Sequence, residues 1–391
     1  ERSGRAERGQ ALRIIAERIA DLFRRNEDAF WRGDGNRILV ATSESLADGD
    51  LERRINMLGA LIKTDAFEHE PTVTVAAVDL DPSLNTSAAV LQRLQIALSH
   101  GQENNLRITR FTEDLYTKVR RKWSLERSIK RSLEDPAHGG FTVHYQPLVS
   151  TRQGKPVVAV EALARWMHPD HGAISPGEFI PIAEDLGIID AIDNFVFNQA
   201  LGDIDLFRKV SPDLLVHVNM SPKGSLATKL DAIRTTVAVH GRGKARSLVV
   251  EVTESALGQQ PRQELLKATQ RLRDTGIGLA VDDFGTGESN FDRVAELPFS
   301  EVKLARTFVD ADHVMLAGLV HSFHSLGLTV VAENIEDADQ LERMTEAHCD
   351  VIQGFYYSRP AEIDTVIEWI RDRMSSDLDA LHAPAPSKPI G

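Results

Sequence analysis

Short apolar runs alternate with helix-like segments through the second half of the chain, and seven runs between Pro156 and Phe355 close on polar residues. A nearly continuous run of Val, Ile and Leu is typical of a strand buried in a parallel sheet. Because the carboxyl ends of parallel strands meet at one rim, we expect their polar ends to gather there. These ends are Glu161, Asn219, Glu251, Asp282 with Asp283, Lys303, Glu333 and Gln353.

The spacing of these runs predicts the fold. Successive polar ends after Asn219 fall 20 to 32 residues apart, about one strand and one helix each. With a first strand at 141–147 this gives eight strands over roughly 230 residues, and a TIM-type barrel typically takes ~250. An open doubly wound sheet, the alternative, would gather its ligands at one switch point. The polar ends therefore favour an α/β protein with a modified (β/α)8 barrel. We expect its helices near 177–205, 224–239, 261–275, 310–326 and 336–347.

The first 112 residues follow another pattern, which predicts a smaller α/β domain ahead of the barrel. Apolar residues have helical spacing over 10–25, strand-like runs flank a turn within 29–42, and a further strand is expected at 72–80. We divide the chain into this domain at 1–112, a connecting helix at 113–139, the barrel at 140–374 and a disordered tail at 375–391.

Composition narrows the function. The net charge is −13, which argues against a nucleic-acid polymer as partner because such binding is built from clustered Lys and Arg. Cys349 is the only cysteine, so no intramolecular disulfide can form and a cytoplasmic setting is expected. No apolar run reaches the ~18 to 20 residues that span a bilayer. Because the chain starts at Glu1 without Met, we expect it to be part of a longer, membrane-anchored or sensory protein.

The polar ends point to metal chemistry. The rim would collect five carboxylates, two amides and an amine, and carboxylates that close together repel one another unless cations neutralise them. Oxygen ligands suit Mg²⁺, Mn²⁺ or Ca²⁺ better than zinc. His168 and His171 have metal-like spacing but no third ligand nearby, so a zinc site is disfavoured. Two divalent ions ~3.5 to 4 Å apart could clamp a phosphodiester and activate water between them.

Several motifs together resemble the EAL-domain family, the metal-dependent phosphodiesterases and receptors of bacterial cyclic di-GMP. The resemblance covers roughly 141–374 and includes Glu161-Ala162-Leu163-Ala164-Arg165-Trp166, Asp282-Asp283-Phe284-Gly285-Thr286-Gly287 and Gln353-Gly354-Phe355. It also includes Tyr145-Gln146-Pro147, His217-Val218-Asn219-Met220-Ser221 and Glu251-Val252-Thr253-Glu254-Ser255. It implies a modified TIM barrel whose first strand, near 141–147, runs antiparallel.

The resemblance also implies roles for single residues. Metal positions match Glu161, Asn219, Glu251, Asp282 and Asp283, and Mg²⁺ or Mn²⁺ would be the working ion, with Ca²⁺ binding without hydrolysis. Catalytic positions that hold water, orient ligands or steady the loop after Asp283 match Lys303, Glu333, Gln353 and Glu254. Contacts to the phosphate, bases and backbone of cyclic di-GMP match Arg165, Gln146, Leu163 and Asp193.

Two single residues and one loop depart from the family pattern. Ala305 stands two residues after Lys303, where the family has an acid, and Asn334 replaces a Gly that usually follows the Ala-Glu pair. The loop after Gly287 carries Glu288-Ser289-Asn290 in place of a bulky residue and small ones. These changes affect the surroundings of the metal positions, so binding of cyclic di-GMP is a firmer expectation than its hydrolysis.

The N-terminal domain resembles the back half of a GGDEF domain, the diguanylate cyclase fold often fused ahead of an EAL domain. Gly4-Arg5 and Gly9-Gln10 precede the first helix, and the signature position falls on Asp34-Gly35-Asn36-Arg37-Ile38. A cyclase needs an acidic pair there to bind metal, and an amide and an arginine cannot replace it. We expect a degenerate, partial GGDEF-like domain that regulates or remains as a structural remnant.

Three functions follow from these patterns. The first is a phosphodiesterase that opens cyclic di-GMP to linear pGpG by two-metal activation of water. The second is a catalytically weak or inactive cyclic di-GMP receptor that signals to a partner, motivated by Ala305 and the altered loop. The third is an unrelated Mg²⁺ barrel enzyme acting on a carboxylate substrate. A homodimer through the EAL domain and an upstream sensory domain are further expectations from the resemblance.

Overall fold

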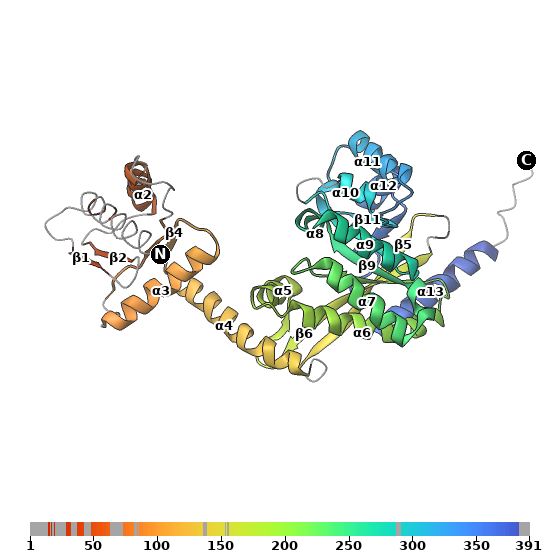
Figure 1. Ribbon diagram of the computed structural model, residues 1–391, viewed down its shortest axis with the longest axis horizontal. Coiled ribbons are helices and arrows are strands. Elements are labelled where there is room, and N and C mark those ends of the chain that lie inside the picture. Colours follow the sequence, from red (N-terminus) through yellow and green to blue (C-terminus); the bar gives the residue numbers. More distant parts are fainter. Residues whose placement is uncertain are drawn as a thin grey trace, which may run out of the picture. The chain divides into compact units, whose positions relative to one another are not determined.

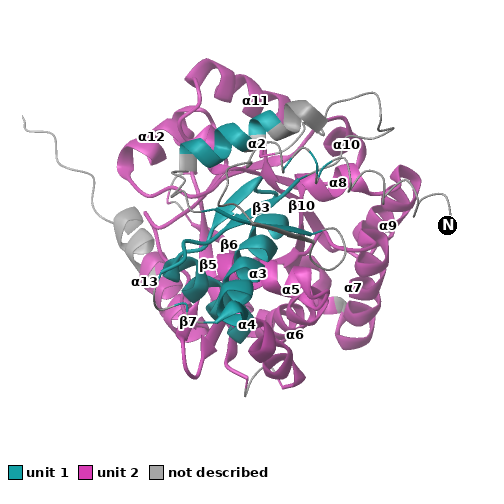
Figure 2. Cartoon of the chain, turned by 90° about the vertical axis from the view of Figure 1, so that its left-hand side faces the viewer, with its two compact units in different colours: residues 1–124 teal, residues 125–391 magenta. Residues whose placement is uncertain are grey.

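The computed structural model describes residues 29–32, 37–42, 48–62, 73–81, 84, 86–135, 139–152, 154, 156–286 and 291–382, together with Ile15, Glu17 and Ile19. The chain forms two compact units, Glu1–Ser124 and Leu125–Gly391, which Figure 2 colours separately. Within the described ranges, no helix is long and apolar enough to cross a membrane.

The first unit contains two small sheets, two whole helices among its described residues, and the start of the helix Glu113–Glu134 (Figure 1). Its strands are β1 (Ala29–Arg32), β2 (Ile38–Ala41), β3 (Val75–Ala77) and β4 (Ile108–Arg110), and its helices are α2 (Asp48–Ile62) and α3 (Ser87–Glu103). β1 and β2 pair antiparallel as the pattern at 29–42 predicts, whereas β3 and β4 pair parallel across α3. The side chain of Thr86 caps α3 by accepting from the Ala89 amide at 3.2 Å.

Much of the remaining N-terminal expectation lies outside the described residues. Ile15, Glu17 and Ile19 are helical, but the rest of the helix expected over 10–25 is not described. The same holds for Gly4-Arg5, Gly9-Gln10 and the signature positions 34–36. The likeness to a GGDEF domain therefore stays a prediction.

Helix α4 (Glu113–Glu134) carries apolar residues of both units, and the division between the units falls inside it. Leu115 packs in the small core of the first unit with Ile96, Ala97 and Phe111. Leu125 and Ile129, fully buried, belong to the large core of the second. The helix fills most of the segment that the sequence assigned to a connector at 113–139.

The second unit is a closed barrel of eight strands with an added edge strand. The ring runs β5-β13-β12-β11-β10-β9-β8-β6 and closes through pairing of β5 with β6, while β7 extends β6 as a hairpin. β5 is antiparallel to both neighbours, and the other ring strands are parallel. The predicted barrel with one antiparallel strand is confirmed. The strands are β5 (Phe141–Ser150), β6 (Val157–His168), β7 (Gly172–Ile174), β8 (Leu215–Met220), β9 (Leu248–Thr253), β10 (Gly278–Phe284), β11 (Glu301–Leu304), β12 (Thr329–Ala332) and β13 (Val351–Gln353).

Helices surround this ring, and the sequence pattern did not predict the short helices α8 and α10, the C-terminal helix α13 or the break between α5 and α6. The helix expected at 177–205 is two helices, because the chain turns at Leu186-Gly187-Ile188 with Gly187 at φ +67°. Short helices α8 and α10 follow β9 and β10. The helices are α5 (Pro176–Asp185), α6 (Ile189–Arg208), α7 (Leu226–His240), α8 (Glu254–Gln259), α9 (Arg262–Asp274), α10 (Phe291–Glu296), α11 (His313–Ser325), α12 (Ala338–Glu346) and α13 (Ile363–His382), with 3₁₀ turns η1 (Arg242–Ser247) and η2 (Arg306–Phe308).

α13 changes the expected boundary of the C-terminal tail. The helix continues through 375–382, which the sequence pattern assigned to a disordered tail at 375–391. Residues 383–391 lie outside the described residues. The Pro-rich composition that suggested disorder begins only after this helix, at 384–389.

The barrel strands divide their side chains between two environments. Alternate residues such as Val216, Val250 and Val302 are fully buried in the large core shared with the helices. A separate cluster of Leu148, Ala159, Val331 and Val351 comes from four ring strands, each two residues along its strand from Gln146, Glu161, Glu333 or Gln353. The polar ends therefore follow an apolar layer.

Candidate metal centre and active site

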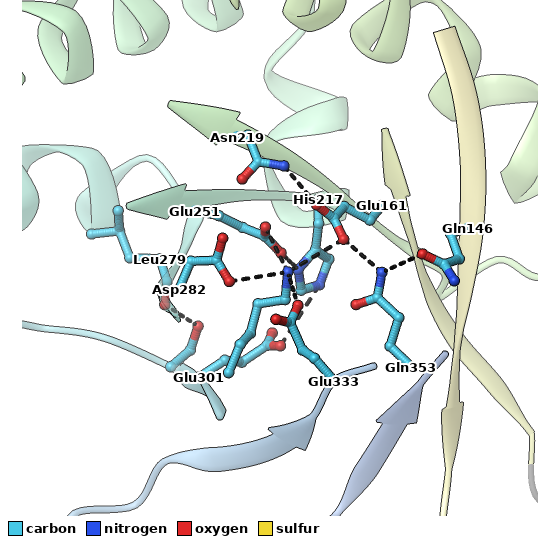
Figure 3. Close-up of polar contacts among 12 residues, drawn as sticks. Gln146, Glu161, His217, Asn219, Glu251, Leu279, Asp282, Glu301, Glu333 and Gln353 are labelled. Carbon is cyan, nitrogen blue, oxygen red and sulfur yellow. Dashed lines mark hydrogen bonds and ion pairs between the residues drawn. The ribbon is translucent and has the colours of Figure 1, made fainter. Parts of the chain in front are cut away.

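Lys303 is 1% exposed and lies among the polar strand ends. Figure 3 labels the acids that surround it: Glu161, Glu251, Asp282 and Glu333. Four carboxylates from different strands surround its ammonium group. The Nζ distances are 2.7 Å to Glu333 Oε1, 2.8 Å to Glu251 Oε2, 3.3 Å to Glu161 Oε2 and 3.4 Å to Asp282 Oδ1. The barrel thus brings together five of the residues that the strand-end pattern singled out.

Amide side chains fix one of these carboxylates on both oxygens. Asn219 Nδ2 donates to Glu161 Oε1 at 2.6 Å, and Gln353 Nε2 donates to Glu161 Oε2 at 2.6 Å. Gln353 Nε2 also donates to Gln146 Oε1 at 3.1 Å, and Gln146 Nε2 donates to the Ser358 carbonyl at 3.0 Å. Glu161 is therefore held in one orientation by strands β8 and β13.

Burial and crowding shift the pKa values of the acids in different directions. Burial, followed by the neighbouring acids, raises the pKa of Glu251, Asp282 and Glu333 against the lowering effect of Lys303. Burial also acts to raise the pKa of Glu161, but Lys303 and the two amide donors outweigh it and lower that pKa. The four acids raise the pKa of Lys303 despite its own burial. One ammonium cannot balance four buried carboxylates, so the site favours further cations.

A cluster of three carboxylates offers the geometry for such a cation. Oxygen atoms of Asp282, Asp283 and Glu333 lie within 4.8 Å of one another. Asp282 Oδ1 is buried and accepts no hydrogen bond, although Lys303 stands at 3.4 Å. An all-oxygen donor set with an unsatisfied buried oxygen fits a hard divalent ion such as Mg²⁺ or Mn²⁺. Glu333, expected to orient water, belongs to this cluster.

The backbone at Asp283 and Gly285 turns the chain out of β10. Asp283 has φ 54° and Gly285 φ +98°, both in the left-handed region. A Cβ on Gly285 would stand 2.2 Å from the ring of Phe308, so no side chain fits there. The buried Glu254 accepts from the Gly285 amide at 2.8 Å, which fixes the loop behind the metal ligands. Residues 287–290, including the altered Glu288 to Asn290, lie outside the described residues.

The predicted substrate contacts come from β5, β6 and α6. Arg165 is half-buried on β6 and donates from Nη1 to the Ala164 carbonyl at 2.7 Å, and Leu163 is half-buried on the same strand. Asp193 Oδ2 accepts from the Ser221 amide at 3.0 Å and lies 3.7 Å from Lys229 Nζ. Burial raises the pKa of Asp193 to about 6.

Two departures from the family pattern have different structural consequences. Ala305 is buried directly after β11 and donates its amide to the Phe284 carbonyl at 3.2 Å, but it offers no carboxylate to Lys303. Asn334 has φ 58°, a conformation that Gly and Asn tolerate better than other residues. Asn334 therefore preserves a backbone conformation that Gly would adopt, whereas Ala305 removes a polar side chain from the surroundings of Lys303.

Sequence reasoning quoted His217 without giving it a role. Its ring is fully buried, with Nδ1 2.7 Å from Glu251 Oε1 and Nε2 3.6 Å from Glu301 Oε2. Its two-residue spacing from Asn219 could have indicated a role in the site, because this spacing places both side chains on one face of β8. Glu301 has the same spacing from Lys303 on β11.

Comparison with known proteins agrees with this geometry. The EAL domain family matches residues 126–360. The chain is 36% identical over 234 residues to the oxygen sensor protein DosP of Escherichia coli K12, covering 58% of this chain and 29% of DosP. It is 29% identical over 377 residues to the cyclic di-GMP phosphodiesterase NbdA of Pseudomonas aeruginosa, covering 93% of this chain and 47% of NbdA. The chain thus spans less than half of either relative.

A solved structure described as "PaMucR Phosphodiesterase, c-di-GMP complex" superposes with a TM-score of 0.57 at 32% identity. The match covers 62% of this chain and 99% of that chain. An EAL domain protein from Listeria monocytogenes EGD-e, at 23% identity and a TM-score of 0.54, shares the fold. With the family match extending over the barrel and its strand-end carboxylates, the chain belongs to the EAL domain family.

Proposed function

We propose that the chain is a Mg²⁺- or Mn²⁺-dependent phosphodiesterase that hydrolyses cyclic di-GMP to linear pGpG. The observation that carries the proposal is the buried oxygen-rich centre around Lys303, with four carboxylates within 3.4 Å of one ammonium. Relatives named as cyclic di-GMP phosphodiesterases, NbdA among them, support the substrate. The reaction adds water to one phosphorus atom and breaks its bond to the 3′ oxygen, which leaves a 5′-phosphate on the product.

The chain's own residues would divide the work of binding and catalysis. Two divalent ions would supply Lewis acidity and lower the pKa of a water molecule. The residues that would hold them are Glu161, Asn219, Glu251, Asp282 and Asp283, with Glu333 close enough to Asp282 and Asp283 to share the second ion. Lys303 would offset the negative charge of the carboxylates and hydrogen-bond the attacking water.

Outside this centre, the remaining residues would position the dinucleotide and the ligands. Arg165 would bind a phosphate, because its guanidinium group is half-buried on β6, four residues after Glu161. Gln146, Leu163 and Asp193 would contact bases and backbone. Gln353 would orient Glu161, which it contacts at 2.6 Å, and Glu254 would keep the loop of Asp283 in place through Gly285.

Turnover by a matched pair of variants tests the proposal. The full chain is incubated with cyclic di-GMP and Mn²⁺, and pGpG is followed by chromatography. We expect turnover by the wild type and by Glu264→Gln, which changes an exposed acid on α9, and a loss of at least 10²-fold for Glu161→Gln. Equal product from the wild type and Glu161→Gln would exclude a phosphodiesterase built on this centre.

A receptor for cyclic di-GMP that hydrolyses it poorly is the second candidate, favoured by Ala305. The buried methyl group stands where the family has an acid, so Lys303 lacks one carboxylate of its usual surroundings. This function predicts tight binding in Ca²⁺, weakened by Arg165→Ala, with little turnover in Mn²⁺. Turnover that rises at least tenfold in Ala305→Asp would support it, and unaltered turnover in that variant would remove the argument from this position.

The resemblance to the EAL-domain family also supports proposals about the first unit, the oligomeric state and the regulation of the barrel. We propose that the first unit is a non-cyclising GGDEF-like remnant and that the barrel forms a homodimer. We further propose that a sensory domain regulates it in the cytoplasm. Sedimentation of the chain with and without cyclic di-GMP tests the dimer, since a monomer in both conditions contradicts it.

A further inference from the structure

His217 and Glu301 form a buried polar pair inside the barrel that none of the proposed roles uses. His217 is fully enclosed, and Glu301 is 8% exposed. The ring stands between two acids, with Glu251 Oε1 at 2.7 Å from Nδ1 and Glu301 Oε2 at 3.6 Å from Nε2. Figure 3 shows the imidazole beside Glu251, among the residues of the centre.

Packing alone does not account for these residues. The layer that precedes the polar ends is apolar, with Leu148, Ala159, Val331 and Val351. An apolar residue at 217 would bury without any partner, whereas burying an imidazole and a carboxylate costs free energy unless each is hydrogen-bonded or paired. The pair therefore requires an explanation from its contacts.

The contacts of Glu251 provide one. Its Oε2 accepts from Lys303 at 2.8 Å, and its Oε1 lies 2.7 Å from His217 Nδ1. Because Lys303 already donates to the other oxygen of this carboxylate, we assign Glu251 Oε1 as the acceptor and His217 Nδ1 as the donor of the second hydrogen bond. With a donor on each oxygen, the plane of the carboxylate is fixed while further lone pairs stay open for a ligand.

We propose that His217 is a positioning residue for Glu251, acting through a hydrogen bond from Nδ1 to Oε1, with Glu301 Oε2 3.6 Å from Nε2 on the other side of the ring. The inference rests on the proposed function, because it assigns Glu251 to a divalent ion. Partners that orient a metal ligand typically change metal affinity or activity by 10- to 100-fold when they are removed. A positioning residue therefore changes the affinity for the divalent ion when its donor is removed, whereas a residue that only packs leaves that affinity unchanged.

Two amide substitutions at His217 distinguish the contribution of Nδ1 from that of Nε2. The side-chain amide of Asn can occupy the place of Nδ1, whereas that of Gln reaches the place of Nε2. Calorimetry with Mn²⁺ on the full chain is expected to give His217→Asn an affinity within about threefold of the wild type and His217→Gln an affinity about 10- to 100-fold weaker. The Mn²⁺ concentration for half-maximal turnover rises in parallel, while kcat at saturating Mn²⁺ changes less than threefold.

Four outcomes decide the inference. Equal Mn²⁺ affinity in the wild type, His217→Asn and His217→Gln overturns it, and so does an equal loss in both variants, which would indicate the ring itself. If His217→Gln does not fold by circular dichroism, His217→Asn still decides, since retained affinity supports the Nδ1 donor and lost affinity refutes it. A wild type that binds no Mn²⁺ overturns the proposed function together with this inference.

Discussion

At the scale of single residues, Lys303 is the counterion that allows a group of acids to be buried together. Its ammonium lies between 2.7 and 3.4 Å from oxygens of four carboxylates. Removing one partner of a buried ion pair is costly because the other charge stays buried without compensation. Stability without metal should therefore depend on this one side chain.

Lys303→Met should lower the free energy of unfolding of the metal-free protein by about 3 to 5 kcal/mol. Urea denaturation in the presence of a chelator measures it. Lys267→Met, which changes an exposed lysine on α9, serves as the control and should differ from the wild type by less than about 0.5 kcal/mol. A Lys303→Met protein as stable as this control would contradict the counterion role.

Asp193 should make stability depend on pH. Because burial raises its pKa from 3.8 to about 6 in the folded state, the folded protein binds this proton more tightly than the unfolded chain. Stability therefore falls as pH rises from about 4 to about 6. Asp193→Asn removes this loss and should be more stable than the wild type at pH 7, by at most roughly 3 kcal/mol.

Urea denaturation of the wild type and Asp193→Asn at several pH values tests this prediction. The two proteins should converge near pH 3.5 and separate as the pH rises. A constant difference across that range would show that Asp193 does not cause the dependence. Binding of cyclic di-GMP should weaken in the same variant if Asp193 contacts the ligand, so a more stable protein would bind less well.

At the scale of elements, the turn out of β10 connects two metal positions to their support. Asp282 and Asp283 close the strand, Gly285 follows with φ +98°, and the ring of Phe308 leaves no space for a side chain. Glu254 at the start of α8 holds the Gly285 amide. The position of this turn therefore depends on a residue from η2 and one from α8.

Gly285→Ala should destabilise the fold by roughly 1 to 3 kcal/mol, because the Cβ overlaps Phe308 and the backbone is left-handed. Mn²⁺-dependent turnover should fall at least tenfold because Asp283 would shift. Gly318→Ala in the middle of α11 is the matched control: nothing lies within 4 Å of its Cβ, and it should gain roughly 0.5 to 1 kcal/mol. Thermal unfolding and turnover are measured for both variants. A Gly285→Ala protein as stable and as active as Gly318→Ala would contradict the role of this turn.

The elements also show how far the sequence could predict the structure. Apolar runs identified the eight ring strands and the rim of Glu161, Lys303 and Gln353, since a strand buried in a parallel sheet is a nearly continuous apolar run whose polar end emerges at the rim. Which side chains meet across the barrel depends on strand tilt and stagger, which no local pattern contains. The contact of His217 with Glu251 could therefore not be predicted, and the pattern placed Asp283 and Glu333 on one rim without showing that their oxygens lie within 4.8 Å of one another.

At the scale of the whole molecule, the barrel gathers one site from strands far apart in the sequence. Gln146 and Gln353 touch across 207 residues, and Glu161 contacts residues of β8, β11 and β13. A ligand that binds only the closed ring must stabilise the fold by linkage. Metal binding should therefore be visible in the stability of the unit, without any substrate.

Mn²⁺ at a hundredfold excess over its dissociation constant should stabilise the wild type by about 2.7 kcal/mol. For a unit of this size the unfolding midpoint should rise by roughly 5 to 10 °C. Differential scanning calorimetry with and without the ion measures the rise, and Asp282→Asn should show less than half of it. An identical rise in both proteins would place the ion elsewhere.

The pairing of β5 with β13 has a consequence for biosynthesis. β5 lies early in the unit and β13 near its end, with Leu148 opposite Gln353, Val149 opposite Ile352 and Ser150 opposite Val351. The ring cannot close until residue 353 has left the ribosome, so the nascent sheet keeps open edges through most of translation. Ribosome stalling or truncation before 353 would release a chain prone to edge-to-edge aggregation.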